Sequence, residues 1–171
     1  MNEKTTRLVL IALLAALCCV ATMVLPIPTP TGGYLNAGDI VVVLSALLAG
    51  PVYGAAAAGV GSLLADLFAG FVIFAPGTLL AKGLAAFVIG FLWKKEKKTF
   101  PAAVFACVCG ELVMVLVYFL YESLCLGIGW AAAAEIAGNL LQGAVGVAGG
   151  LALYHALIRV PEIRRFSEQF K

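Results

Sequence analysis

Charge is scarce in this sequence. Asp, Glu, Lys and Arg make up 12% of the 171 residues, while 63% are hydrophobic. Soluble domains carry about 25% charged residues, so this composition excludes an ordinary soluble globule. It predicts an all-α integral membrane protein, and the length suits a single membrane domain over residues 1–171. The first apolar run is long and leads into proline-rich sequence, so we expect a retained helix rather than a cleaved signal peptide.

Residue patterns that carry chemistry are also missing. The chain has one histidine and no GxxxxGK[ST] loop, and none of its five cysteines forms a CxxC pair. A nucleotide-binding loop, a nucleophile with its base, and a metal-ligand spacing are therefore not predicted. We expect no enzyme, and no metal or cofactor in this chain.

The basic residues that are present fall into three clusters. Ten of the eleven lie at Lys4 and Arg7, at Lys94, Lys95, Lys97 and Lys98, and at Arg159, Arg164, Arg165 and Lys171. The positive-inside rule puts all three clusters in the cytoplasm, which explains the lysines without a nucleic-acid partner. Six transmembrane helices with both termini inside satisfy this rule. Their expected ranges are 7–25, 39–49, 52–71, 77–93, 101–126 and 130–158.

The range 39–49 is short for a membrane span, which needs about 20 residues. A tilted or partly re-entrant segment that ends at Gly50-Pro51 is the alternative. With only five crossings, however, the cluster Lys94–Lys98 would lie outside, so the sequence favours six.

Residues 25–39 form the longest polar break in the chain. Three prolines in five residues forbid a helix and favour an extended path, and Gly32-Gly33 permits a sharp reversal. Tyr34 and Asn36 follow, with hydrogen-bonding side chains. Asp39 stands where the next helix begins, as an N-cap would. The loop is interpreted as one wall of a binding site; a plain connector is the alternative.

Two polar stripes follow the last two helices. Glu111, Tyr118 and Glu122 share one helical face, as do Glu135, Asn139 and Gln142. Both stripes run from the outer end towards the midplane. One stripe alone would fit hydrogen bonding between helices, but two favour a polar pocket that opens outward.

Asp66 and Lys82 are ionisable residues inside predicted helices, where charge is costly. They are placed to form an ion pair, and a ligand contact is the alternative, above all for Lys82. The candidate substrate-binding residues are Tyr34, Asn36, Lys82, Glu111, Tyr118, Glu122, Glu135 and Asn139.

Four segments carry a family resemblance, at residues 33–39 (GYLNAGD), 47–51 (LLAGP), 61–67 (GSLLADL) and 75–83 (APGTLLAKG). Their order and spacing resemble the substrate-binding S components of energy-coupling factor (ECF) vitamin transporters, in the riboflavin, hydroxymethylpyrimidine and pyridoxine branch. The resemblance implies a vitamin-binding subunit in a prokaryotic cell membrane. It further implies a T component and two ATPases as partners, with ATP used by the ATPases.

The resemblance also implies docking on the T component through alanines of the first helix. Ala12 and Ala16 match an AxxxA pattern, whereas Val20 departs from it. Close packing inside the bundle is the alternative for these two alanines.

The sequence thus predicts an importer subunit that binds a small hydroxylated vitamin of the pyridoxine or hydroxymethylpyrimidine kind. A riboflavin-binding S component is the main rival. A stand-alone secondary transporter, with Glu111 and Glu135 as proton carriers, is a second rival, and a membrane enzyme is a third.

Overall fold

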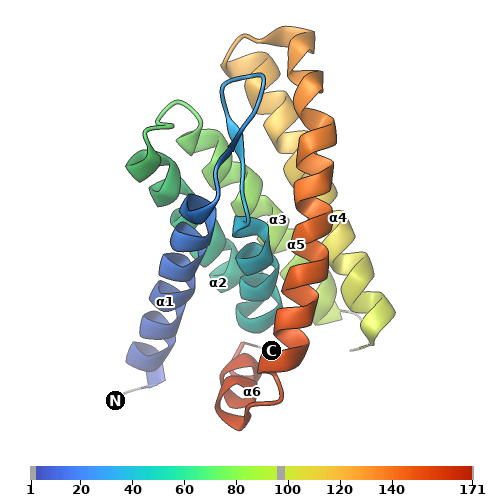
Figure 1. Cartoon of the computed structure of the whole chain (residues 1–171). Coiled ribbons are helices and arrows are strands. Elements are labelled where there is room, and N and C mark those ends of the chain that lie inside the picture. The colour runs from blue at the N-terminus through green and yellow to red at the C-terminus, as the bar shows by residue number, and fades with distance from the viewer. Residues whose placement is uncertain (1–2, 96–98, 171) are drawn as a thin grey trace.

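The computed structural model describes residues 3–95 and 99–170, so Lys97, Lys98 and Lys171 lie outside the described residues. Within these ranges the protein is a helical bundle capped at one end by a small β-hairpin (Figure 1). The elements are α1 (Glu3–Val24), β1 (Ile27–Pro28), β2 (Tyr34–Leu35), α2 (Gly38–Ala69), α3 (Ala75–Lys95), α4 (Phe100–Leu120), a π-helix (Tyr121–Cys125), a 3-10 helix (Gly129–Glu135), α5 (Ile136–Leu157) and α6 (Pro161–Glu168).

Helix α2 is two arms joined by a reversal. Gly50 is non-helical inside it, with φ 72°, and Pro51 follows. A Cβ added to Gly54 would lie 2.8 Å from the Cα of Ala46, which is possible only if the second arm folds back on the first. The predicted break at Gly50-Pro51 is therefore confirmed, and glycine is needed there because φ is positive.

Five helices of the described part are long and apolar enough to cross a membrane, with α2 counted once. Successive passes alternate in direction once the two arms of α2 are separated (Figure 1). The start of α1, the end of α3, the start of α4 and helix α6 therefore lie together at one end of the bundle, which we call the basic end. The hairpin, the turn at residues 70–74 and the segment 121–135 lie at the other end, called the hairpin end.

The extended path and sharp reversal expected within residues 25–39 take the form of a β-hairpin. Ile27 pairs with Leu35 and Pro28 with Tyr34 in an antiparallel ladder. Between the strands, Gly32 turns the chain with φ 87°, and the amide of Thr29 donates to Gly33 O at 3.0 Å.

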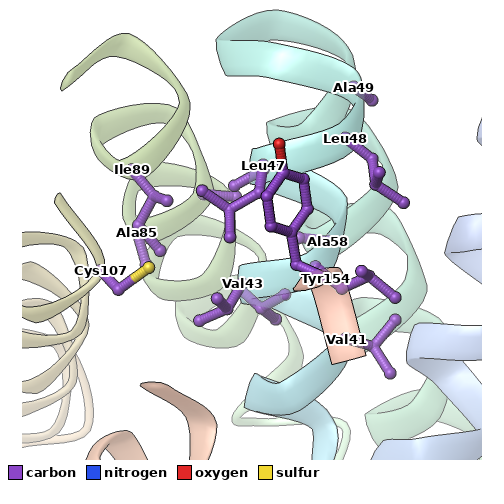
Figure 2. Packing of buried hydrophobic residues seen from close by; sticks show 14 of the residues in the cluster. Val41, Val43, Leu47, Leu48, Ala49, Ala58, Ala85, Ile89, Cys107 and Tyr154 are labelled. Atoms are coloured by element: carbon purple, nitrogen blue, oxygen red, sulfur yellow. The ribbon is translucent and has the colours of Figure 1, made fainter. Parts of the chain in front are cut away.

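The core surrounds the first arm of α2. Val42, Val43, Ala46 and Leu47 are almost wholly buried, and Figure 2 shows Val43 and Leu47 of this arm in the cluster that also holds Ala85, Ile89, Cys107 and Tyr154. Small residues bring the helices close together. A Cβ on Gly110 would meet Ile89, and one on Gly150 would meet Val43.

The last two predicted helices end differently from the expectation of 101–126 and 130–158. Helix α4 stops at Leu120, and the chain passes through the π-helix and the 3-10 helix before α5 begins at Ile136. These irregular turns place Glu122 and Glu135 at the hairpin end. Single π-turns in helices are often found at functional sites.

Candidate binding site beneath the hairpin

A polar cavity of about 30 Å³ lies beneath the hairpin. Its walls come from the hairpin, α2, the 70–74 turn, α3, α4, the π-helix, the 3-10 helix and α5. The lining residues are Thr29, Gly33, Tyr34, Asn36, Asp66, Phe74, Thr78, Tyr118, Glu122, Glu135, Asn139 and Gln142.

Six of the eight predicted binding residues line this cavity: Tyr34, Asn36, Tyr118, Glu122, Glu135 and Asn139. Two predicted residues, Lys82 and Glu111, do not line it. Thr29 and Thr78 line it but were not predicted. Thr78 lies one helical turn before Lys82, so the i, i+4 spacing was a usable signal.

The hairpin is held over the cavity by hydrogen bonds from its own donors. Thr31 donates from its amide and its hydroxyl to Glu135 Oε1, at 2.9 and 2.8 Å. Tyr34 donates its hydroxyl to Asp66 Oδ1 at 2.6 Å, and its ring packs on Phe71 with centroids 4.4 Å apart. Burial and the Asp66 bond raise the pKa of Tyr34, so its hydroxyl remains a donor at neutral pH.

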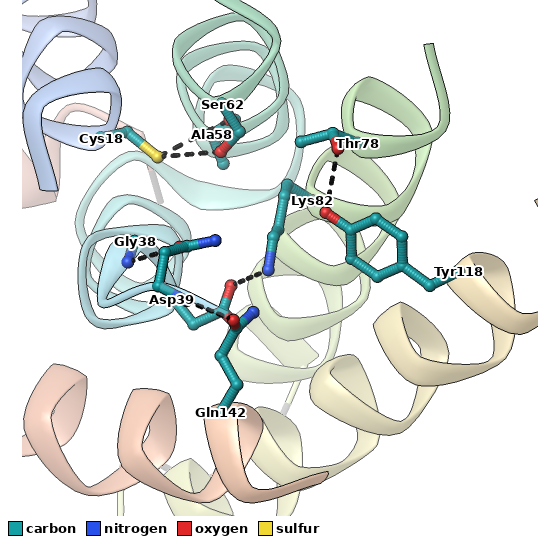
Figure 3. Close-up of polar contacts among 10 residues, drawn as sticks. Cys18, Gly38, Asp39, Ala58, Ser62, Thr78, Lys82, Tyr118 and Gln142 are labelled. Atoms are coloured by element: carbon teal, nitrogen blue, oxygen red, sulfur yellow. Dashed lines mark hydrogen bonds and ion pairs between the residues drawn. The ribbon is translucent and has the colours of Figure 1, made fainter. Parts of the chain in front are cut away.

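An ion pair beneath the cavity involves a different acid from the one predicted. Lys82 Nζ lies 2.5 Å from Asp39 Oδ1, and neither side chain is more than 1% exposed (Figure 3). The expected pair of Lys82 with Asp66 is wrong, because Asp66 instead accepts from Tyr34. Asp39 is not the N-cap of α2 either, since Ala37 takes that position and Asp39 turns towards Lys82.

Gln142 connects this ion pair to the hairpin. Its Nε2 donates to Asp39 Oδ2 at 2.7 Å (Figure 3). Its Oε1 accepts from the amide of Asn36, also at 2.7 Å. The Lys82 ammonium also lies 5.3 Å from the centre of the Tyr118 ring. The Tyr118 hydroxyl donates to Thr78 Oγ1 at 3.1 Å.

Glu111 lies below the cavity, against α5. Its carboxylate is near Gly143 and Gly146, and the residue is 5% exposed. Helical periodicity placed Glu111 on the face of Tyr118 correctly, but two turns of helix carry it beneath the cavity.

Three aromatic residues near the rim of the cavity differ in their surroundings. Phe74 lines the cavity. Trp130 is 87% exposed and packs on Phe119, and Tyr121 donates to Ile73 O at 2.7 Å. Only Phe74 of the three is therefore placed to stack on a bound molecule.

The alanines of α1 lie outside the bundle. Ala12 and Ala16 are exposed, as is Val20 one turn further along the same face. Close packing inside the bundle, the alternative for these alanines, is excluded by this exposure.

The architecture and the cavity can be compared with known proteins. The family model described as "ECF-type riboflavin transporter, S component" matches residues 2–159. The chain belongs to this family. The prediction of an ECF S component is therefore confirmed. An S component is the substrate-binding subunit of an ECF transporter, and the family is not an enzyme family.

Two similar proteins accompany the family match. A Pyrococcus woesei protein, described as an uncharacterized protein in the gap 3′ region, is 38% identical over 135 residues, covering 77% of this chain and 89% of its own length. A solved structure of the S component of a bacterial ECF transporter is 23% identical with a TM-score of 0.77. It covers 92% of this chain and 98% of the other. That structure shows that this S component has the same fold, and its apolar helices fit a membrane protein.

Proposed function

We propose that this S component captures a small hydroxylated heteroaromatic vitamin, of the pyridoxine or hydroxymethylpyrimidine kind, in the cavity beneath the hairpin. The observation that carries the proposal is an excess of acceptors. Asp66 Oδ2 and Glu122 Oε2 are buried without a hydrogen-bond partner among the described residues. A buried acceptor left unpaired costs about 1–3 kcal/mol, so a ligand that brings hydroxyl or N–H donors gains by satisfying them.

The aromatic residues in the lining support a ligand with a flat ring. Phe74 and Tyr118 lie among walls that are otherwise mostly polar. A single heteroaromatic ring would stack on an aromatic side chain while its substituents reach Glu122 and Asn139.

Riboflavin is the second candidate, and the description of the matching family model favours it. The two candidates differ in the aromatic surface they require. A three-ring ligand needs broad apolar walls, whereas this cavity is lined mainly by hydroxyl, amide and carboxyl groups.

Mass spectrometry of the small molecules released from the purified protein identifies the ligand. We expect pyridoxine or a hydroxymethylpyrimidine at close to one molecule per chain. Riboflavin in the same yield would replace the first candidate with the second. A protein that binds none of these, alone or in titrations, would contradict the proposed cavity.

We further propose that the chain crosses the cell membrane six times, with the basic end in the cytoplasm. The support is the alternating direction of the passes together with Lys94, Lys95, Arg159, Arg164 and Arg165 near one end. The native Cys125 is exposed at the hairpin end and serves as an internal reference. An impermeant thiol reagent should label Cys125 on intact cells but not a cysteine introduced as Lys95→Cys in a Cys125→Ala background. Labelling of the Lys95→Cys protein from outside would refute this orientation.

Delivery of the vitamin is proposed to follow docking on a T component that carries two ATPases. The exposed small-residue face at Ala12 and Ala16 supports this, because small side chains let another helix approach closely. ATP would then be used by the partners, with no cofactor in this chain. Co-purification with a T component and two ATPases is expected. Vitamin uptake by this subunit alone in proteoliposomes would instead support the stand-alone transporter.

A further inference from the structure

Within residues 3–95 and 99–170, the side-chain hydrogen bonds between the hairpin and the rest of the bundle run in one direction. The hairpin supplies the donors, which are Thr31 N, Thr31 Oγ1, Tyr34 OH and Asn36 N. The bundle supplies the acceptors, which are Glu135, Asp66 and Gln142. All three acceptor side chains line the cavity. A vitamin rich in donors would therefore compete with the hairpin for the same acceptors.

Gln142 differs from the other two acceptors because its side chain is also hydrogen-bonded to a member of the buried ion pair. Its Oε1 accepts from the hairpin while its Nε2 donates to Asp39, so both polar atoms are occupied. Asp39 in turn is held by Lys82, which is wholly buried. Asp66 Oδ2, by contrast, has no partner among the described residues. The contact at Asn36 is therefore backed by a buried ion pair, whereas the bond at Tyr34 ends on a half-satisfied carboxylate.

Packing distinguishes the base of the hairpin from its tip in the same way. At the base, a Cβ added to Gly38 would lie 2.2 Å from Thr22 Oγ1 and 2.7 Å from Asn36 Oδ1. Asn36 Oδ1 also accepts from the amide of Gly38 at 2.8 Å. At the tip, nothing lies within 4 Å of a Cβ added to Gly32. The base is tightly packed and the tip is open.

We propose that Gln142 is a positioning residue that anchors the base of the hairpin to the Asp39–Lys82 pair, so that the hairpin opens about Asn36. The contacts that break on opening are those of Thr31 with Glu135 and of Tyr34 with Asp66. Gln142 then sets where the lid closes, and the released acceptors become available to the vitamin. The inference rests on the proposed function only in taking the cavity beneath the hairpin as the vitamin site.

Hydrogen–deuterium exchange of the vitamin-free protein in nanodiscs tests the anchor directly. Gln142→Met keeps the length of the side chain but removes both hydrogen bonds. We expect the Asn36 amide to exchange about 5- to 150-fold faster in this variant, the range for one lost buried hydrogen bond. The tip around Thr31 should also exchange faster, because it loses its fixed base.

Thr31→Val is the matched variant at the tip, where it removes the hydroxyl bond to Glu135. We expect faster exchange at the tip while the Asn36 amide stays as protected as in the parent. Leu140→Met, on the exposed side of α5, is the control for mutating that helix and should leave the hairpin unchanged.

Three results would overturn the anchor. One is an Asn36 amide that remains equally protected in Gln142→Met, and another is Thr31→Val releasing the base as much as the tip. Acceleration along the whole of α5 in Gln142→Met would also overturn it, since that pattern reports loss of helix packing. Because no vitamin is present, failure of the protein to bind one would count against the proposed function and leave this measurement unaffected.

Discussion

Helices α1 and α2 are both strongly apolar, but α1 lies at the edge of the bundle and α2 lies at its centre. In their most apolar stretches, 22% of α1 is buried, compared with 61% of α2. Helix α2 buries Asp39, Ser45, Ser62 and Asp66, whereas α1 exposes Leu13, Leu17 and Val20 to its surroundings. The comparison teaches that apolarity places a helix in the membrane, and that its buried polar and small residues place it within the bundle.

The comparison assigns different tasks to the two helices. Helix α2 holds the ion pair and one wall of the cavity, so its substitutions should affect folding and ligand binding. The outer face of α1 touches neither, so its substitutions should affect only what docks there. The predictions below test this division, starting with the largest expected effect.

Ala16→Trp should abolish vitamin uptake by the complete transporter while the isolated subunit still binds its vitamin with nearly the parent affinity. The reason is that a bulky side chain on the exposed face of α1 blocks close approach of a partner helix. Uptake in cells and titration of the purified subunit measure the two effects. Leu116→Trp, on the exposed side of α4, is the control and should preserve uptake. Equal loss of binding and uptake in Ala16→Trp would place this face inside the bundle.

Lys82→Met should lower the free energy of unfolding by about 3–5 kcal/mol, because it leaves Asp39 buried without its cation. Thermal unfolding in detergent should show the lower stability. The double variant Lys82→Met/Asp39→Asn removes both charges and keeps an oxygen for Gln142. It should recover part of the loss. If Lys82→Met unfolds no more easily than the parent, the ion pair does not hold α2 and α3 together.

Gly61→Ala tests the contact between α1 and α2. A Cβ at this position would lie 2.3 Å from Ala15 O and 2.9 Å from Cys18 Cβ, so the two helices must move apart. We expect a loss of about 1–3 kcal/mol in unfolding free energy, as overpacking typically causes. Gly83→Ala is the matched control, since its nearest new neighbour would be Ala55 O at 3.7 Å. Similar melting temperatures for the two variants would show that α1 is attached only loosely.

Much of the architecture could be predicted because its signals are local. The prolines and Gly32-Gly33 predicted an extended segment that reverses, and Gly50-Pro51 predicted the helix break within α2. The two polar stripes predicted five of the twelve lining residues of the cavity, because residues three and four apart share a helical face.

The remaining features depend on contacts that no local pattern contains. Lys82 pairs with Asp39 rather than with Asp66. This pairing depends on the reversal at Gly50, which folds α2 so that its start lies beside α3. The irregular turns that carry Glu122 and Glu135 break the 3.6-residue period on which the helix limits were predicted. Gln142, which the sequence placed on a polar stripe without a specific role, connects α5 to both the hairpin and the ion pair.

The central claim is that the cavity beneath the hairpin binds the vitamin, and calorimetric titration of point variants tests it most directly. Asn139 and Glu122 line the cavity and are buried. Asn139→Ala and Glu122→Ala should each cost about 1–3 kcal/mol, which weakens binding roughly 5- to 150-fold, while the proteins still fold and insert. Leu140→Ala, which faces away from the cavity, should bind as the parent does. If both cavity variants bind as tightly as the parent protein, the vitamin site lies elsewhere and the account is contradicted.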